Sequence, residues 1–154
     1  MTSGILAGAA AGAAATTALN AVTYIDMVVR GRPVSSTPED TIETLSQKAG
    51  VPIPGDEQTR ANRVAGLGPL GGLAAGVGVG VALGLARSAG WRSGPVGTTL
   101  AASAGALMAG NGPMTVLGVT DPRTWSTADW LSDVGPHVAY GAVAAYVLRG
   151  LTDR

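Results

Sequence analysis

The residues best suited to chemistry lie near the carboxyl-terminal end of the chain. Asp129, Asp133 and His137 follow one another at intervals of four residues, and Tyr140 comes three residues later. Residues three and four apart share one face of a helix, so all four side chains can lie together. If Asp133 fixes the tautomer of His137, the imidazole can exchange protons near neutral pH, which predicts a proton relay or a small-ion site.

Two asparagines in apolar surroundings, Asn20 and Asn111, could complete this polar site. Ionisable groups are costly at membrane depth and usually face a protein interior or water. The alternative is structural and is the preferred interpretation. In it the two aspartates lie at a membrane surface, and His137 bonds to a neighbouring helix or to the carbonyl that Pro136 frees.

The residue types do not favour a metal site, a catalytic nucleophile or a nucleotide-binding site. The chain has one histidine and no cysteine, so neither a typical zinc or copper set nor bis-histidine haem ligation can be built. No G-x-S-x-G or S-x-x-K motif occurs, and the only lysine, Lys48, lies in a polar segment. No P-loop lysine follows the glycines. We therefore expect no enzyme, no metal site and no cofactor.

The composition indicates the environment that must hold these residues. Charged residues make up 13% of the 154 residues, about half the usual fraction, and 24 are glycine, with alanine more frequent still. Small side chains bury little area in water, whereas helices in a bilayer associate through close backbone approach. Ten basic and ten acidic residues give a net charge of zero without a basic run, so a nucleic-acid partner is not expected.

Four apolar stretches are long enough to be membrane-spanning helices, each of which needs about 20 residues. The predicted spans are 4–29, 64–86, 94–119 and 126–149, within one membrane domain over 1–154. We expect the third span to break at 111–113, where Asn-Gly-Pro interrupts the apolar pattern. A cleaved signal peptide is the alternative for the first stretch, but no Lys or Arg precedes it.

The polar segment 30–62 separates the first two spans and is predicted to contain one short amphipathic helix over 38–49. Pro38 suits the first helical position, and Gly50 suits the position just beyond the last turn. The narrow apolar stripe of this helix could lie on the membrane surface. The simpler interpretation packs the stripe against the rest of the bundle.

Glycine spacing is the most specific pattern in the sequence. Glycines recur every fourth residue in two stretches, as Gly4, Gly8 and Gly12 and as Gly68, Gly72, Gly76, Gly80 and Gly84. Such a series forms a groove on one side of a helix, where another backbone can approach closely. The grooves serve either the packing of the chain itself, or contact with another membrane protein or a lipid chain.

These features together predict an all-α fold, an integral membrane four-helix bundle with glycine-zipper packing and one short amphipathic loop helix. The chain also carries the motifs Thr23-Tyr24-Ile25-Asp26, Ser36-Thr37-Pro38-Glu39, Asn62-Arg63 and Pro136-His137-Val138-Ala139-Tyr140-Gly141. This layout resembles small bacterial, mainly actinobacterial, inner-membrane proteins and is distantly similar to the YagU-like family, whose function is unsettled. The resemblance implies a four-helix inner-membrane protein and supplies no catalytic site.

We expect a small accessory or scaffold subunit that packs through its glycine faces on a larger membrane assembly, such as a transporter or respiratory complex. The alternative is a small proton-coupled transporter or channel that uses the polar face of 126–149. Bound lipids and homo-oligomers fit both interpretations. The segment 30–62 is expected in the cytoplasm, because its end of the bundle has six Lys and Arg residues against four at the other, namely Arg87, Arg92, Arg149 and Arg154.

Overall fold

The computed structural model describes residues 2–152, and every regular element within them is helical, which confirms the all-α class. Met1, Asp153 and Arg154 lie outside this range, so the last of the four basic residues expected at the second end is not described. The helices are α1 (Thr2–Arg30), α2 (Thr37–Ala49), α3 (Glu57–Ser88), α4 (Pro95–Leu117) and α5 (Thr127–Thr152), with a short 3-10 helix at Pro122–Thr124.

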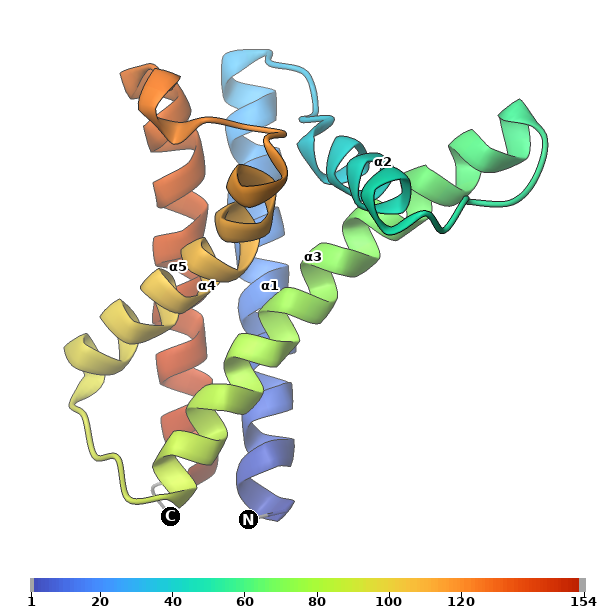
Figure 1. The fold of residues 1–154 in the computed structure, drawn as a ribbon. Coiled ribbons are helices and arrows are strands. Elements are labelled where there is room, and N and C mark those ends of the chain that lie inside the picture. Colours follow the sequence, from blue (N-terminus) through green and yellow to red (C-terminus); the bar gives the residue numbers. More distant parts are fainter. Residues whose placement is uncertain (1, 153–154) are drawn as a thin grey trace.

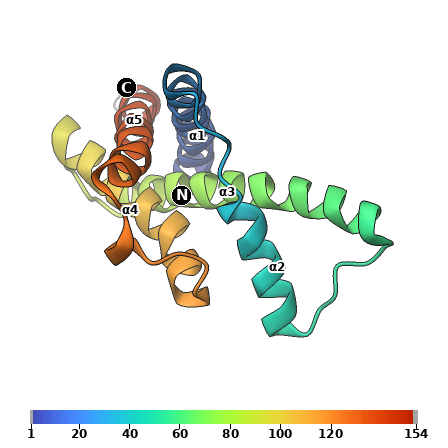
Figure 2. The ribbon, with the colours of Figure 1, turned by 90° about the horizontal axis from the view of Figure 1, so that it is seen from above.

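The long helices pack in antiparallel pairs. α1 and α5 run side by side, α4 packs on α5, and α3 crosses α1 at an angle (Figure 1). The first half of α3 extends away from the bundle, with α2 beside it, as the view from above shows (Figure 2). The bundle therefore has two ends, one with α2 and the loop between α4 and α5, and one with both chain ends.

The core is built from alanine and not from large side chains. The buried alanines are Ala7, Ala11, Ala15, Ala102, Ala106, Ala144 and Ala145. The largest fully buried side chains, Tyr140 and Leu148, lie between these alanines. Because alanine adds little volume, the helix backbones lie close together and each contact buries little area.

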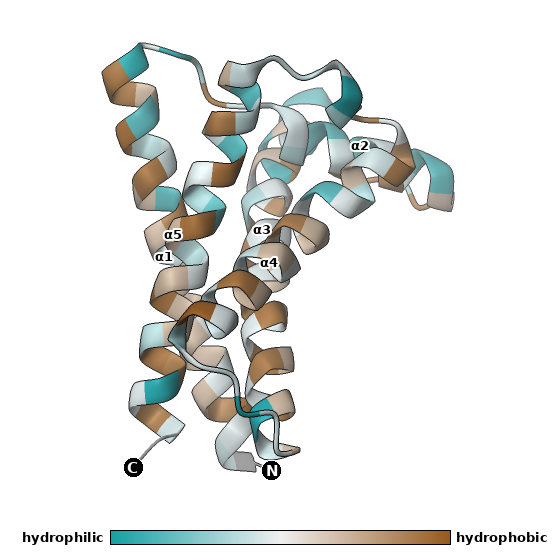
Figure 3. Ribbon diagram, turned by 90° about the vertical axis from the view of Figure 1, so that its left-hand side faces the viewer, coloured by the Kyte–Doolittle hydropathy of each residue, from teal (hydrophilic) through white to brown (hydrophobic). Residues whose placement is uncertain are grey.

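Large apolar side chains lie mainly on the outside, where Val28, Val116 and Tyr146 are 82%, 85% and 82% exposed. The accessible surface is 8796 Å². A folded soluble protein of 15.1 kDa exposes about 7,100 Å². Hydrophobic residues follow the helices along their length, and hydrophilic ones gather toward the end that carries α2 (Figure 3). In the described chain two helices, α1 and α3, are long and apolar enough to cross a membrane.

Local capping explains where two helices begin. α3 begins at Glu57 and not at residue 64, because the Asp56 side chain accepts a hydrogen bond from the backbone N–H of Thr59 at 2.7 Å. The same bond lowers the pKa of the Asp56 carboxyl below its usual value. At α5 a capping box forms, since the Asp129 N–H donates to Ser126 Oγ at 3.2 Å and the Ser126 N–H donates to Asp129 Oδ2 at 2.9 Å.

The predicted break at 111–113 is wrong, because α4 is one continuous helix from Pro95 to Leu117. Pro113 lies inside the helix and removes only the hydrogen bond to the carbonyl of Ala109. Its side chain is exposed, so the ring meets no neighbouring helix. α4 ends instead at Gly118, whose φ of 78° is a left-handed conformation that glycine adopts readily.

Candidate functional site

Three polar side chains meet between α4 and α5, and we call Asn111, Asp133 and His137 the polar cluster. Asn111 Nδ2 donates a hydrogen bond to Asp133 Oδ2 at 2.7 Å, from one helix to the other. His137 Nδ1 lies 2.7 Å from the backbone oxygen of Asp133 and 3.6 Å from Asp133 Oδ1. The side chains of His137 and Asp133 are 13% and 19% exposed. A carboxylate and an imidazole thus lie within reach of each other and are largely shielded.

Both α4 and α5 determine the position of the His137 imidazole. In α5 His137 follows Asp133 by one helical turn, which places both on the side that faces α4. In α4 the facing residue is Gly110, where a Cβ would lie 3.7 Å from His137 Nε2. A larger residue at 110 would extend into the space of the ring. No sequence pattern marks this role of Gly110, because the contact depends on how α4 pairs with α5.

The contacts of His137 define what the polar cluster can do. An Nδ1–H that donates to the Asp133 carbonyl leaves Nε2 as the nitrogen that can take up a proton. One oxygen of the Asp133 carboxylate lies beside the ring, and the other accepts the hydrogen bond from Asn111. The cluster therefore combines an imidazole and a carboxylate, the two side chains that most often take part in proton transfer. Within residues 2–152 no group of three His, Cys, Asp or Glu side chains is placed to hold a metal ion.

The structure does not bring the other predicted polar residues into this cluster. Asn20 is exposed on the outer side of α1, and Asp129 is exposed in the capping box. Tyr140 is buried, and its hydroxyl donates to the carbonyl oxygen of Gly76 at 2.6 Å. For Asp129 the reason is geometric, since each step of four residues turns the helix face by about 40°. Over two such steps Asp129 and His137 point about 80° apart.

Six of the eight predicted packing glycines lie where α1 and α3 cross. They face one another in antiparallel order, with Gly4 near Gly84, Gly8 near Gly80, and Gly12 near Gly76. A Cβ on Gly8 would lie 2.4 Å from the Gly80 carbonyl oxygen, and one on Gly80 would lie 2.3 Å from the Gly8 carbonyl oxygen. Both distances are shorter than Cβ contacts in real proteins, so any side chain at the crossing must push the backbones apart.

The remaining two glycines have different surroundings in the first half of α3. A Cβ on Gly68 would lie 3.2 Å from Pro38 Cβ, so Gly68 packs on the start of α2. A Cβ on Gly72 would meet nothing within 4 Å. Every residue from 69 to 74 is exposed, and we call this stretch the bare segment of α3. On its N-terminal side α2 covers the glycine stripe of α3 at Gly68, and on its C-terminal side α1 covers the stripe from Gly76 onward.

A comparison of the chain with models of protein families, with curated proteins and with solved structures finds no match. Function is therefore inferred from the residues and their geometry. Two features carry that inference, the polar cluster between α4 and α5 and the bare segment of α3.

Proposed function

We propose that the chain is a multi-pass protein of the bacterial inner membrane that acts as an accessory or scaffold subunit of a larger membrane assembly. In this proposal α1, α3, α4 and α5 all span the bilayer. The end that carries α2 faces the cytoplasm, because it holds more Lys and Arg than the opposite end. The protein stabilises its assembly and catalyses no reaction.

The distribution of side chains supports the membrane placement. α1, α3, α4 and α5 contain 29, 32, 23 and 26 residues. Each is therefore about 35 Å long or longer, against a hydrocarbon thickness of about 30 Å. The most apolar windows of α1 and α3 are only 28% and 22% buried inside the structure. An alanine core under a surface of large apolar side chains is typical of a protein in lipid. Lipid tails are as apolar as these side chains, so moving the side chains into the protein interior gains no free energy.

The bare segment of α3 is the observation that carries the proposed role. Small residues on a membrane helix are typical of contact with a second helix, since they let the backbones approach. α2 covers the glycine stripe at Gly68, and α1 covers it from Gly76 onward. Gly72 lies between them on the same stripe and has no neighbour in its own chain. We propose that a helix of the partner packs on α3 at Gly72.

Single-cysteine crosslinking tests this contact cleanly, because the chain contains no cysteine. Gly72→Cys and Gly78→Cys form a matched pair, since a Cβ at either site meets nothing within 4 Å. The two sites differ by about 120° around the helix. With a photoactivatable thiol label in native membranes, Gly72→Cys should give one defined protein adduct and Gly78→Cys only lipid adducts. Equal labelling of protein from both sites, or from neither, contradicts the proposed interface.

The polar cluster favours a second candidate function, a small proton-coupled transporter or channel. The specific observation is an imidazole and a carboxylate that are shielded together and tied to a second helix by Asn111. Ionisable side chains within a membrane-spanning helix often mark a path for ions or protons. The same contacts also suit a structural role, so a flux measurement must separate the two.

His137→Ala is expected to abolish a pH-dependent proton flux in proteoliposomes, if the polar cluster carries protons. Asn62→Ala is the control, because Asn62 is exposed and bonds only to Gln58 of its own helix. The far-ultraviolet circular dichroism of both variants should match that of the wild type. A wild-type protein without flux between about pH 5 and pH 8 removes this candidate and leaves His137 a structural role.

A further inference from the structure

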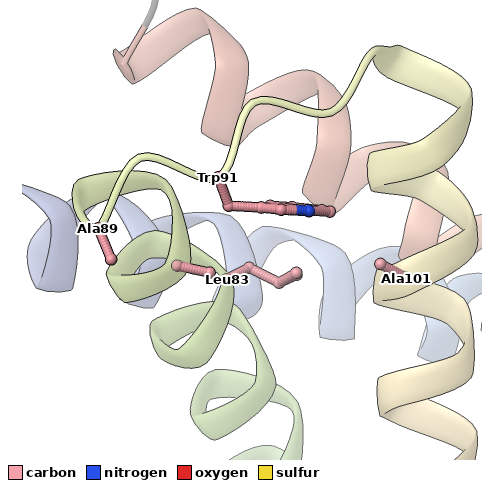
Figure 4. A pocket seen from close by; sticks show the side chains of 5 residues that line it. Leu83, Ala89, Trp91 and Ala101 are labelled. Carbon is pink, nitrogen blue, oxygen red and sulfur yellow. The ribbon is translucent and has the colours of Figure 1, made fainter.

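A hollow with apolar walls lies between the end of α3 and the start of α4, at the end of the bundle opposite α2. Its volume is about 390 Å³, and it is shallow and widely open to the outside of the bundle. The walls consist of Leu83, Ala86, Ala89, Trp91 and Ala101. The Trp91 indole lies across the hollow, with Leu83 on α3 and Ala101 on α4 facing the same space (Figure 4).

Hydrogen-bond donors without a protein acceptor lie next to this hollow. In the described part of the chain the Trp91 indole N–H and the Arg92 guanidinium donate to no protein atom. By contrast, the indole N–H of Trp125 donates to Thr120 Oγ1 at 2.9 Å. Tryptophan and arginine in such a position are typical of the boundary between hydrocarbon and headgroups.

The start of α4 adds further donors at the same place. Its N-cap is Gly94, which has no side chain to bond the first backbone N–H groups, and Pro95 follows. The amides of Val96 and Gly97 therefore have no partner within the helix. Together with the helix dipole, they favour an anionic group above the first turn of α4.

The charges at this end of the bundle favour an anion as well. Arg87, Arg92 and Arg149 lie near this end, while every acidic residue between 2 and 152 belongs to the helix halves and loops toward the end with α2 (Figure 1). Arg87 Nε donates to Thr152 Oγ1 at 2.9 Å, and Arg149 Nη1 donates to the Ser93 carbonyl at 3.2 Å. Arg92 is the one of the three that is exposed, so its guanidinium can reach a ligand.

We propose that the hollow is a binding site for one anionic phospholipid of the surrounding bilayer. An acyl chain lies against Leu83 and Ala101 beneath the Trp91 indole, and the phosphate contacts Arg92 and the first amides of α4. This inference rests on the membrane placement given under the proposed function. It does not depend on a protein partner at Gly72.

Thermal unfolding in a neutral detergent tests the site with added phosphatidylglycerol and phosphatidylcholine. Phosphatidylglycerol should raise the Tm of the wild type by several degrees more than phosphatidylcholine does. Arg92→Gln should lower the apparent affinity for phosphatidylglycerol at least tenfold, because it removes the charge at the phosphate. Ala101→Leu should have a similar effect, because the added side chain fills the hollow. Arg123→Gln removes an exposed arginine at the opposite end and should respond as the wild type does.

Equal shifts with the two lipids, or an Arg92→Gln response equal to that of the wild type, would overturn the lipid site. Arg92→Gln changes an exposed side chain and keeps the fold, so the test does not depend on Ala101→Leu. A wild-type chain that dissolves without detergent would instead refute the membrane placement itself. The two failures are therefore distinguishable.

Discussion

Gly80→Ala is expected to lower the free energy of unfolding by about 3 kcal/mol, the upper end of the usual range for overpacking. A Cβ at Gly80 would lie 2.3 Å from the Gly8 carbonyl oxygen and 2.6 Å from Gly12 Cα. Both atoms belong to the backbone of α1, so no side chain can rotate away. The two helices must separate, and the contacts on both sides of the crossing are weakened with them. Gly80→Leu should prevent the native packing altogether.

Gly78→Ala is the matched control, because Gly78 lies on the same helix and a Cβ there meets nothing within 4 Å. Alanine is the better helix former by about 1 kcal/mol, so this variant should be as stable as the wild type or slightly more stable. Denaturant unfolding in mild detergent, followed by circular dichroism, measures both variants. Equal stabilities of Gly78→Ala and Gly80→Ala would show that α1 and α3 do not approach as described.

Tyr140→Ala is expected to lower the free energy of unfolding by about 3–5 kcal/mol, as for other large aromatic side chains in cores. Tyr140 is fully buried and packs among Ala15, Ala102, Ala106 and Ala144. Alanine side chains cannot rotate into the space that the ring leaves, so a cavity remains. Tyr140→Phe keeps the ring and removes only the bond to Gly76, which should cost about 1 kcal/mol.

The same unfolding measurement separates the contributions of the ring and the hydroxyl. Tyr146→Ala provides the comparison, because Tyr146 is 82% exposed on the same helix and fills no core space. We expect the stabilities to fall in the order wild type, Tyr140→Phe, Tyr140→Ala, with Tyr146→Ala close to the wild type. A Tyr140→Ala variant as stable as Tyr146→Ala would mean that the centre of the bundle is not packed around this ring.

Much of the local structure could be predicted from the sequence. The helical class followed from long apolar stretches, and the short helix over 38–49 followed from Pro38 and Gly50, since α2 runs from Thr37 to Ala49 and ends at Gly50. The break at 111–113 was wrong because Asn-Gly-Pro is a strong turn signal in an isolated segment. In the bundle, α4 continues through Pro113 with the loss of one backbone hydrogen bond.

The pairing of the helices could not be predicted in the same way. Glycine periodicity marks a surface for close approach, but the partner of each glycine depends on the crossing of α1 and α3. Asn111 and Asp133 are far apart in sequence, and their hydrogen bond depends on the register of α4 against α5. The predicted polar face included Asp129 because spacing by four residues ignores the rotation that accumulates along a helix. Tyr140 points nearly the same way as Asp133, but it lies about 10 Å further along α5 and bonds to Gly76 of α3. Asn20 lies on α1, and its exposed side chain does not face α5.

The hollow beside Trp91 left no pattern in the sequence. Its walls come from the end of α3, the following loop and the second turn of α4, so only the folded chain brings them together. Arg92 and Gly94 read as ordinary loop residues when each is considered alone. Their significance depends on the apolar walls next to them.

The proposed scaffold role is tested most directly by extracting the tagged chain from its own membranes in mild detergent, with Gly72→Leu in parallel. The proposal predicts that the wild type comes with one larger integral membrane protein in fixed stoichiometry, identified by mass spectrometry. The Gly72→Leu variant should fold, because a side chain at position 72 meets no atom of its own chain within 4 Å. It should be recovered without the partner, because the leucine side chain fills the space in which the partner helix packs. A wild type that is recovered alone, or a partner that stays bound to Gly72→Leu, would contradict the proposal.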